Sequence, residues 1–248
     1  MISSDITQLP LLLLLLAVVA FLYASVGHGG ASGYLALMSI FGFSIAVMKP
    51  TALVLNILVS GLSFYFYFRA KEFHWKLFYP FAITSVPFSF LGGTITIETH
   101  WYKIILGTVL LFAIARLLGL LGAIQNQERP VNLPLALFIG AVIGFLSGLI
   151  GIGGGIILSP VLLLLGWATM KQTAAVSALF ILVNSVSGLF GFVSQGGILP
   201  QSSIPFIGVV LVGGILGGYF GSKKMNTLVL RNVLALVLGI AVFKLYTT

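Results

Sequence analysis

Gly27-His28-Gly29-Gly30-Ala31-Ser32-Gly33 and Gly151-Ile152-Gly153-Gly154-Gly155 are the two stretches that decide the fold of this 248-residue chain. Each follows an apolar segment and precedes a short apolar segment, after which comes a lone lysine, Lys49 or Lys171. In a bilayer, non-helical backbone is tolerated only where protein or a polar cavity satisfies its polar groups. Two broken helices at corresponding places in two halves therefore point to the binding site of a transporter.

The composition indicates an integral membrane protein. Hydrophobic residues make up 59% of the chain and charged residues only 6%, whereas a soluble domain is roughly a quarter charged. The net charge of +8 does not indicate nucleic acid, because the basic residues lie singly or in pairs at segment ends, as the positive-inside rule requires. The absence of cysteine excludes disulfides and thiolate metal sites, and we expect no cofactor.

Ten apolar segments organise the chain into two halves. We expect a first membrane repeat over 1–124, a connecting loop over 125–131 and a second repeat over 132–248. Most segments have the roughly 20 residues that span a bilayer, but 31–43 and 155–166 are shorter, which leaves open whether they complete re-entrant hairpins or bent crossing pairs. The others are 10–26, 50–68, 76–96, 101–122, 132–150, 171–193, 203–222 and 228–246. The first lacks the basic start of a cleaved signal peptide, so we expect a retained helix.

Matching residues predict that the halves arose by duplication. Gly42-Phe43 corresponds to Gly166-Trp167, and Pro80-Phe81 corresponds to Pro205-Phe206. Basic loops nevertheless fall at non-equivalent places, because the loop 69–76 holds three basic residues and its counterpart holds none. Equivalent loops on opposite sides of the membrane are what an inverted repeat predicts.

The expected fold is therefore an all-α polytopic membrane protein of two inverted repeats. Each repeat has a glycine-broken helix pair and three long transmembrane helices. The charge pattern places the loops 69–76, 123–131 and 223–231 in the cytoplasm and both termini outside.

The glycine clusters predict an anion site. A helix N-terminus offers free N–H groups and a partial positive charge, and glycine lets a ligand approach the backbone. No aspartate or glutamate lies inside a predicted span, which disfavours a cation substrate. The candidate substrate-binding residues are His28, Gly29, Gly30, Ser32, Asn56, Gly153, Gly154, Gly155 and Asn184.

Each candidate also has a purely structural interpretation. Glycine permits close helix packing, serine bonds its own helix backbone, and asparagine joins helices within a membrane. His28 could carry a proton or merely bond a carbonyl in the bend. Lys49 and Lys171 could draw anions inward, although reaching toward the lipid headgroups is the simpler interpretation.

The duplicated Gly-x-Gly-Gly breaks, each with a following lysine and an asparagine-bearing span, resemble the TauE/SafE family of sulfite and organosulfonate exporters. The resemblance covers nearly the whole chain and is closest at 151–155, with Pro160 downstream; the first cluster departs from it at His28 and Ala31. It implies a multi-pass permease of the bacterial inner membrane for sulfite, sulfonates or related small anions, plausibly coupled to protons. The exact substrate, the direction of transport and a homodimeric state all stay open.

Three other functions compete. Gly30-Ala31-Ser32-Gly33 fits the Gly-x-Ser-Gly pattern of rhomboid proteases, but His74 and His100 lie at segment ends, so we expect no enzyme. Paired half-helices also build passive channels such as aquaporins, although the Asn-Pro-Ala motif of those channels is absent. A membrane anchor for other proteins is disfavoured because the chain has only short loops.

Overall fold

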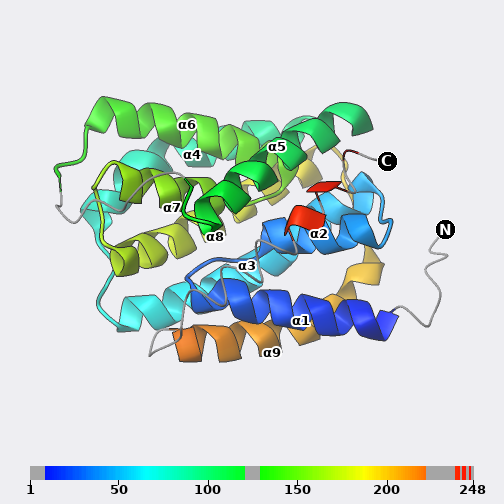
Figure 1. The fold of residues 1–248 in the computed structure, drawn as a ribbon. Coiled ribbons are helices and arrows are strands. Elements are labelled where there is room, and N and C mark those ends of the chain that lie inside the picture. The colour runs from blue at the N-terminus through cyan, green and yellow to red at the C-terminus, as the bar shows by residue number, and fades with distance from the viewer. Residues whose placement is uncertain (1–8, 121–128, 222–237, 241, 244–245, 247–248) are drawn as a thin grey trace.

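The chain forms a bundle of helices. We describe it from a computed structural model, over residues 9–120, 129–221, 238–240, 242–243 and 246. Among these residues there is no strand, and each segment expected from the sequence is a helix (Figure 1). The helices are α1 Leu9–Ser25, α2 Ala31–Ile40, α3 Ile45–Arg69, α4 Trp75–Thr94, α5 Thr99–Leu117, α6 Leu133–Ile150, α7 Gly155–Leu164, α8 Met170–Ser194, the 3₁₀ turn η1 Gln201–Ser203, and α9 Ile204–Gly221. The expected segment 228–246 and loop 223–231 fall largely outside the described residues, as does most of the loop 125–131.

The two glycine-broken pairs are hairpins. In the second half, the backbone N–H of Arg129, just before α6, donates to the carbonyl of Gly166, just after α7, at 2.6 Å. The pair α6–α7 therefore begins and ends at one end of the bundle. The pair α1–α2 begins and ends toward the opposite end (Figure 1). The short helices α2 and α7 have only 10 residues each, so each turns back after about 15 Å, less than the thickness of a bilayer core.

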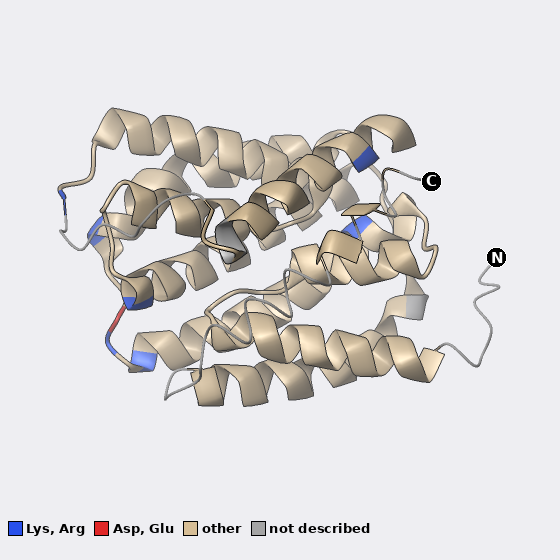
Figure 2. Cartoon of the chain, in the orientation of Figure 1, with Lys and Arg blue, Asp and Glu red and all other residues tan. Residues whose placement is uncertain are grey.

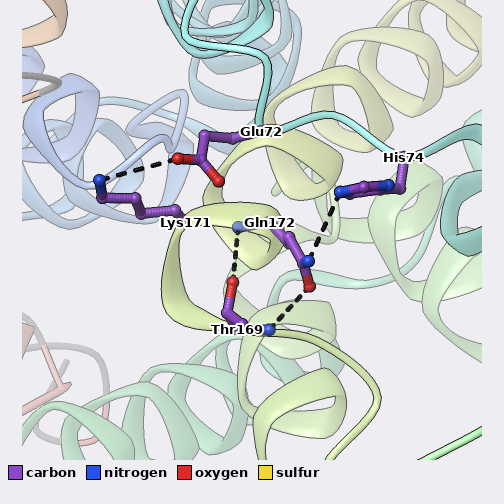
Figure 3. Close-up of polar contacts among 5 residues, drawn as sticks. All are labelled: Glu72, His74, Thr169, Lys171 and Gln172. Atoms are coloured by element: carbon purple, nitrogen blue, oxygen red, sulfur yellow. Dashed lines mark hydrogen bonds and ion pairs between the residues drawn. The ribbon is translucent and has the colours of Figure 1, made fainter. Parts of the chain in front are cut away.

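Helices α3 and α8 occupy corresponding places in the two halves and run antiparallel. The start of α8 is fixed by a capping box, in which the Thr169 hydroxyl accepts from Gln172 N–H and the Gln172 side chain accepts from Thr169 N–H. Beside it, Lys171 pairs with Glu72 at 3.7 Å and Gln172 contacts His74 at 3.4 Å (Figure 3). Since Glu72 and His74 follow the end of α3, α8 begins where α3 ends, and the two helices pack together.

The closest helix contacts join one half to the other. Helix α1 packs along α9 and α4 packs along α6, so exchanging the halves maps one pair onto the other. Glycines spaced four apart make both contacts, since a Cβ on any of them would collide with backbone of the facing helix. On α6 these are Gly140, Gly144 and Gly148, which face Phe81, Ser85 and Ser89; on α9 they are Gly213, Gly217 and Gly221, which face Ala17, Phe21 and Ser25.

We expect Gly144→Leu to lower the melting temperature strongly. Its Cβ would collide with the carbonyl of Ser85, and a backbone neighbour cannot move aside as a side chain can. Overpacking a tight contact costs about 1–3 kcal/mol or more. Gly208→Leu on α9 is the matched control, because nothing lies within 4 Å of a Cβ at that position. Equal melting temperatures for the two purified variants in detergent would contradict this account of the α4–α6 contact.

Four described helices are long and apolar enough to cross a membrane, namely α3, α6, α8 and α9. The expectation of three such helices in each half is therefore met in part. Helix α4 has 20 residues but carries prolines and serines, and two of its serines, Ser85 and Ser89, are buried beneath α6. Large apolar side chains such as Ile83, Phe138 and Phe190 are exposed on the bundle. An apolar exterior is what a lipid environment requires, so the protein is membrane-embedded.

Candidate functional site

Both short helices begin at glycines in the left-handed conformation. Gly30 has φ +96° and caps α2, and Gly154 has φ +78° and caps α7. Gly151 and Gly153 also have positive φ, at +88° and +73°. A side chain in this region costs roughly 1–2 kcal/mol per residue, so these turns require glycine. The sequence therefore folds into a glycine turn before each short helix, one in each half, although Gly153 has positive φ and Gly29 does not.

Asn56 brings the two turns together. It is buried on α3, and its Oδ1 accepts a hydrogen bond from the N–H of Ala31, the first residue of α2, at 3.2 Å. Its Nδ2 donates to the carbonyl of Ile152 at 3.4 Å and to Ser185 Oγ at 2.9 Å. A Cβ on Gly29 would collide with Oδ1, and one on Gly153 would collide with Nδ2. One amide therefore bridges both glycine turns.

The glycines at the start of α7 fit closely against apolar side chains. A Cβ on Gly154 would lie 2.7 Å from Ile143 Cγ2 and 2.9 Å from Phe180 Cε1. A Cβ on Gly155 would collide with Ile181, which also lies against Gly29 and Gly153. Both turns are buried. The turns are thus occluded, and a solute reaches them only if the surrounding helices move.

Several backbone donors at these helix starts have no partner among the described residues. The N–H of Ala31 is used by Asn56 and that of Tyr34 by the Gly30 carbonyl, but the N–H groups of Ser32 and Gly33 between them make no such bond. The same holds for Gly155 and Ile156 at the start of α7, whereas the next two donate to Gly154. Unpaired first-turn donors carry the partial positive charge of the helix and suit an anion.

The hydroxyl groups near the site bond to protein. Ser32 Oγ lies 2.7 Å from the Tyr23 hydroxyl and ties α2 to α1. Thr51 Oγ1 lies 2.6 Å from Ser203 Oγ, in the other half. The hydroxyl of Ser32 is therefore already hydrogen-bonded. Its backbone N–H, which has no partner among the described residues, is the Ser32 donor that a ligand could use.

His28 begins a polar chain that crosses between the halves. Its Nδ1 lies 2.9 Å from the Val26 carbonyl, and its Nε2 lies 2.9 Å from Ser159 Oγ on α7. Ser159 Oγ in turn lies 2.8 Å from Ser177 Oγ on α8. The expected bond to a carbonyl in the bend is present, and the imidazole also contacts Ser159 in the other half, which was not expected. Neutral imidazole with hydrogen on Nδ1 would donate to Val26 and accept from Ser159.

Asn184 is not the structural counterpart of Asn56. Its Nδ2 donates to the carbonyl of Phe180, one turn back on its own helix, at 2.8 Å, and its buried Oδ1 has no partner among the described residues. The residue of α8 that faces the glycine turns as Asn56 does is Ile181. The structure therefore brings eight of the nine sequence candidates into the two turns and their bridge, and leaves Asn184 apart from them.

Two serines of this region were not expected from the sequence, and Lys49 was named there without its burial. Ser185 bonds Asn56, Ser159 bonds His28, and Lys49 contacts Gly151 while it is only 6% exposed. The two serines carried no signal, because serine is common in membrane helices. Lys49 did carry a signal in the sequence, since it precedes Asn56 by two helical turns and therefore lies on the same face of the helix.

Comparison with known proteins gives a consistent result. A family model described as sulfite exporter TauE/SafE matches residues 12–245. A probable membrane transporter protein of Sinorhizobium fredii is 37% identical over 234 residues, which are 92% of this chain and 94% of that protein. A probable membrane transporter protein of Methanocaldococcus jannaschii is 27% identical over 251 residues, with 94% and 93% covered. No solved structure matches the chain.

Proposed function

Because this chain belongs to the TauE/SafE family of membrane transporters, we propose that it is a permease for small sulfur-containing anions such as sulfite or sulfonates. One observation carries the proposal: the amide of Asn56 joins the start of α2 to the turn that precedes α7, and the first-turn N–H groups of both helices include donors with no partner among the described residues. An oxyanion with several acceptor oxygens complements such a set of donors.

The proposed mechanism is alternating access of one half against the other. The halves form an inverted repeat in this proposal, supported by the antiparallel run of α3 and α8 and by the exchangeable pairs α1–α9 and α4–α6. Rocking of one repeat against the other would open the occluded turns first to one side and then to the other. Since Asn56 bonds Ala31 in its own half and Ile152 and Ser185 in the other, it lies at the boundary that such rocking would disturb.

We further propose an orientation in the bacterial inner membrane. Figure 2 shows lysine and arginine gathered mainly at the end of the bundle where α3 leads into α4 and α7 leads into α8. Basic loops face the cytoplasm, so that end is cytoplasmic in the proposal. The start of α1 lies at the opposite end (Figure 1), so in this proposal the N-terminus is outside. The C-terminus is proposed to lie outside as well.

The first test is ligand-dependent stability of the purified protein in detergent. A ligand that binds only the folded state raises the melting temperature in proportion to its occupancy. The panel is sulfite, sulfate, thiosulfate, sulfoacetate, taurine, lactate and chloride. A selective rise with sulfite or a sulfonate supports the proposal and identifies the substrate class. Folded protein that responds to none of them contradicts it.

Vesicle transport separates a carrier from a channel. Protein reconstituted in liposomes should show saturable uptake of the identified anion, and preloaded unlabelled anion should accelerate entry of labelled anion. A passive channel shows no such counterflow. Linear, non-competitive flux would overturn alternating access and favour the channel.

Proton coupling is tested at His28, because imidazole is the side chain that ordinarily changes charge between about pH 5 and 8. Protonation turns Nε2 from an acceptor into a donor and reverses the direction of its bond with Ser159. We expect His28→Gln to flatten the pH dependence of uptake, measured with isethionate, whose sulfonate does not titrate in this range. Ser159→Ala, which keeps the imidazole, should shift the profile and not flatten it. A His28→Gln variant with the wild-type pH profile would exclude His28 as the proton carrier.

A further inference from the structure

Lys49 is a positive charge buried inside the bundle. It lies in the first turns of α3 and is 6% exposed. Its Nζ donates to the carbonyl of Gly93 at 3.4 Å and to that of Ile95 at 3.3 Å, at the C-terminal end of α4. The Phe192 ring of α8 lies 5.9 Å away. An ammonium has three donors, so these two long bonds leave one N–H unused.

No carboxylate balances this charge among the described residues. The one ion pair there joins Lys171 to Glu72, and Glu98, three residues after Ile95, is exposed and makes no ion pair with Lys49. A buried ammonium is costly unless it is paired, and ionisable residues within membrane segments mark the paths of ions and substrates. The carbonyls at the end of α4 offer only partial charge. Something with a full negative charge would complete this site.

Lysine at the corresponding position of the other half has a different environment. Lys171 follows α7 as Lys49 follows α2, and each is preceded by methionine. The side chain of Lys171 is 73% exposed and paired with Glu72 across the surface. Burial is thus a property of Lys49 and does not follow from the duplicated sequence. A side chain that only reaches toward the lipid headgroups would be exposed, which describes Lys171 but not the buried Lys49.

The position of Lys49 connects it to the candidate site. Lys49 and Asn56 are seven residues apart on α3, which places them on one face, about 10 Å apart along the helix axis. A Cβ on Gly151 would lie 3.2 Å from Lys49 Cγ, while the adjacent Ile152 bonds Asn56. The ammonium and the amide therefore flank the same glycine turn. The ammonium is on the side toward Ile95, whose side chain is exposed.

We propose that Lys49 is the charge-selecting residue of the permeation path, and that it supplies the counter-charge to a sulfonate or other small anion passing between the α4 end of the bundle and Asn56. This inference rests on the proposed transport function and names the residue that makes it selective for anions. A neutral analogue that lacks the sulfonate would gain nothing from this contact, whereas sulfoacetate and isethionate would.

The test measures initial uptake of isethionate against concentration in liposomes, together with the melting temperature with and without isethionate. Lys49→Gln removes the charge but keeps an N–H donor for the carbonyls of Gly93 and Ile95, which favours folding. We expect its KM to rise at least about tenfold, as for loss of one partner of a close charge pair. The rise in melting temperature that isethionate causes in the wild type should disappear in Lys49→Gln. The melting temperature without ligand should stay near that of the wild type. Lys49→Arg should recover part of the affinity, and Lys171→Gln should match the wild type.

The outcomes are distinct. Wild-type protein that neither binds nor transports any anion overturns the proposed function itself. Wild-type protein that transports isethionate, with Lys49→Gln equal to it in KM and in ligand-induced stabilisation, overturns only the role of Lys49. A Lys49→Gln variant with a lower ligand-free melting temperature but an unchanged KM assigns Lys49 to structure and also overturns the proposal.

Discussion

Gly153→Ala is expected to reduce anion uptake by about 10- to 100-fold, the equivalent of losing one or two buried hydrogen bonds. The added methyl group would collide with Asn56 Nδ2 and lie 2.8 Å from both Ile181 Cγ2 and Ser185 Oγ. To make room, the amide must leave Ile152 or Ser185, and the two glycine turns lose their bridge. The measurement is initial uptake in liposomes, normalised to the amount of folded protein.

The control for Gly153→Ala isolates the collision from backbone strain. Gly196 has φ +79° and Gly42 has φ +76°, close to the +73° of Gly153, but nothing lies within 4 Å of a Cβ at either position. Gly196→Ala and Gly42→Ala therefore carry the same roughly 1–2 kcal/mol of left-handed strain without the contact. They should lower stability somewhat and leave uptake near the wild-type level. If all three variants lose uptake equally, the effect belongs to strain and not to the site.

Asn56→Asp is expected to abolish anion binding while the chain still folds. The aspartate keeps an acceptor for the Ala31 N–H but has no donor for Ile152 and Ser185, and it places a negative charge against the proposed anion. Like charges at close range cost several kcal/mol, enough for a loss of more than about 100-fold. Binding is read from the rise in melting temperature with sulfite or a sulfonate.

Two further variants interpret this result. Asn56→Leu removes the same bonds without adding charge, so weaker binding in the aspartate variant than in the leucine variant identifies an electrostatic effect. Asn184→Asp makes the same substitution on α8, where the amide bonds only its own helix among the described residues. It should cost stability and leave the ligand response intact. If Asn184→Asp loses binding as strongly as Asn56→Asp does, Asn184 is part of the binding site.

The glycine turns could be predicted from sequence because their evidence is local. Positive φ, an apolar setting and a short following segment all leave marks within a few residues, as at Gly153 and Gly154. The start of α8 at Met170 lies within one residue of the apolar segment expected from 171. Most other helix bounds follow from apolar runs to within about three residues, but α3 begins at Ile45 and not at 50, and α5 ends at Leu117 and not at 122.

The partners of the site could not be predicted, because they depend on contacts between distant segments. Pairing Asn56 with Asn184 required a register for α3 against α8 that matching residues do not fix, and the structure places Ile181 there instead. Lys49 and Lys171 follow the same local pattern, and the simpler interpretation treated them alike. What separates them is the end of α4, which covers Lys49, and the exposed loop with Glu72, which meets Lys171.

The glycine-lined contact between α1 and α9 has a consequence for how the protein is made. Helix α4 meets α6 after a connecting stretch of about 40 residues, but α1 ends at Ser25 and its main packing partner begins at Ile204. At roughly 5–20 residues per second, ribosomal synthesis of the intervening chain takes roughly 10–40 s. During that time the α1 surface formed by Ala17, Phe21 and Ser25 faces lipid or a chaperone instead of the α9 glycines. Helix α1 therefore reaches its final place only after α9 has been made.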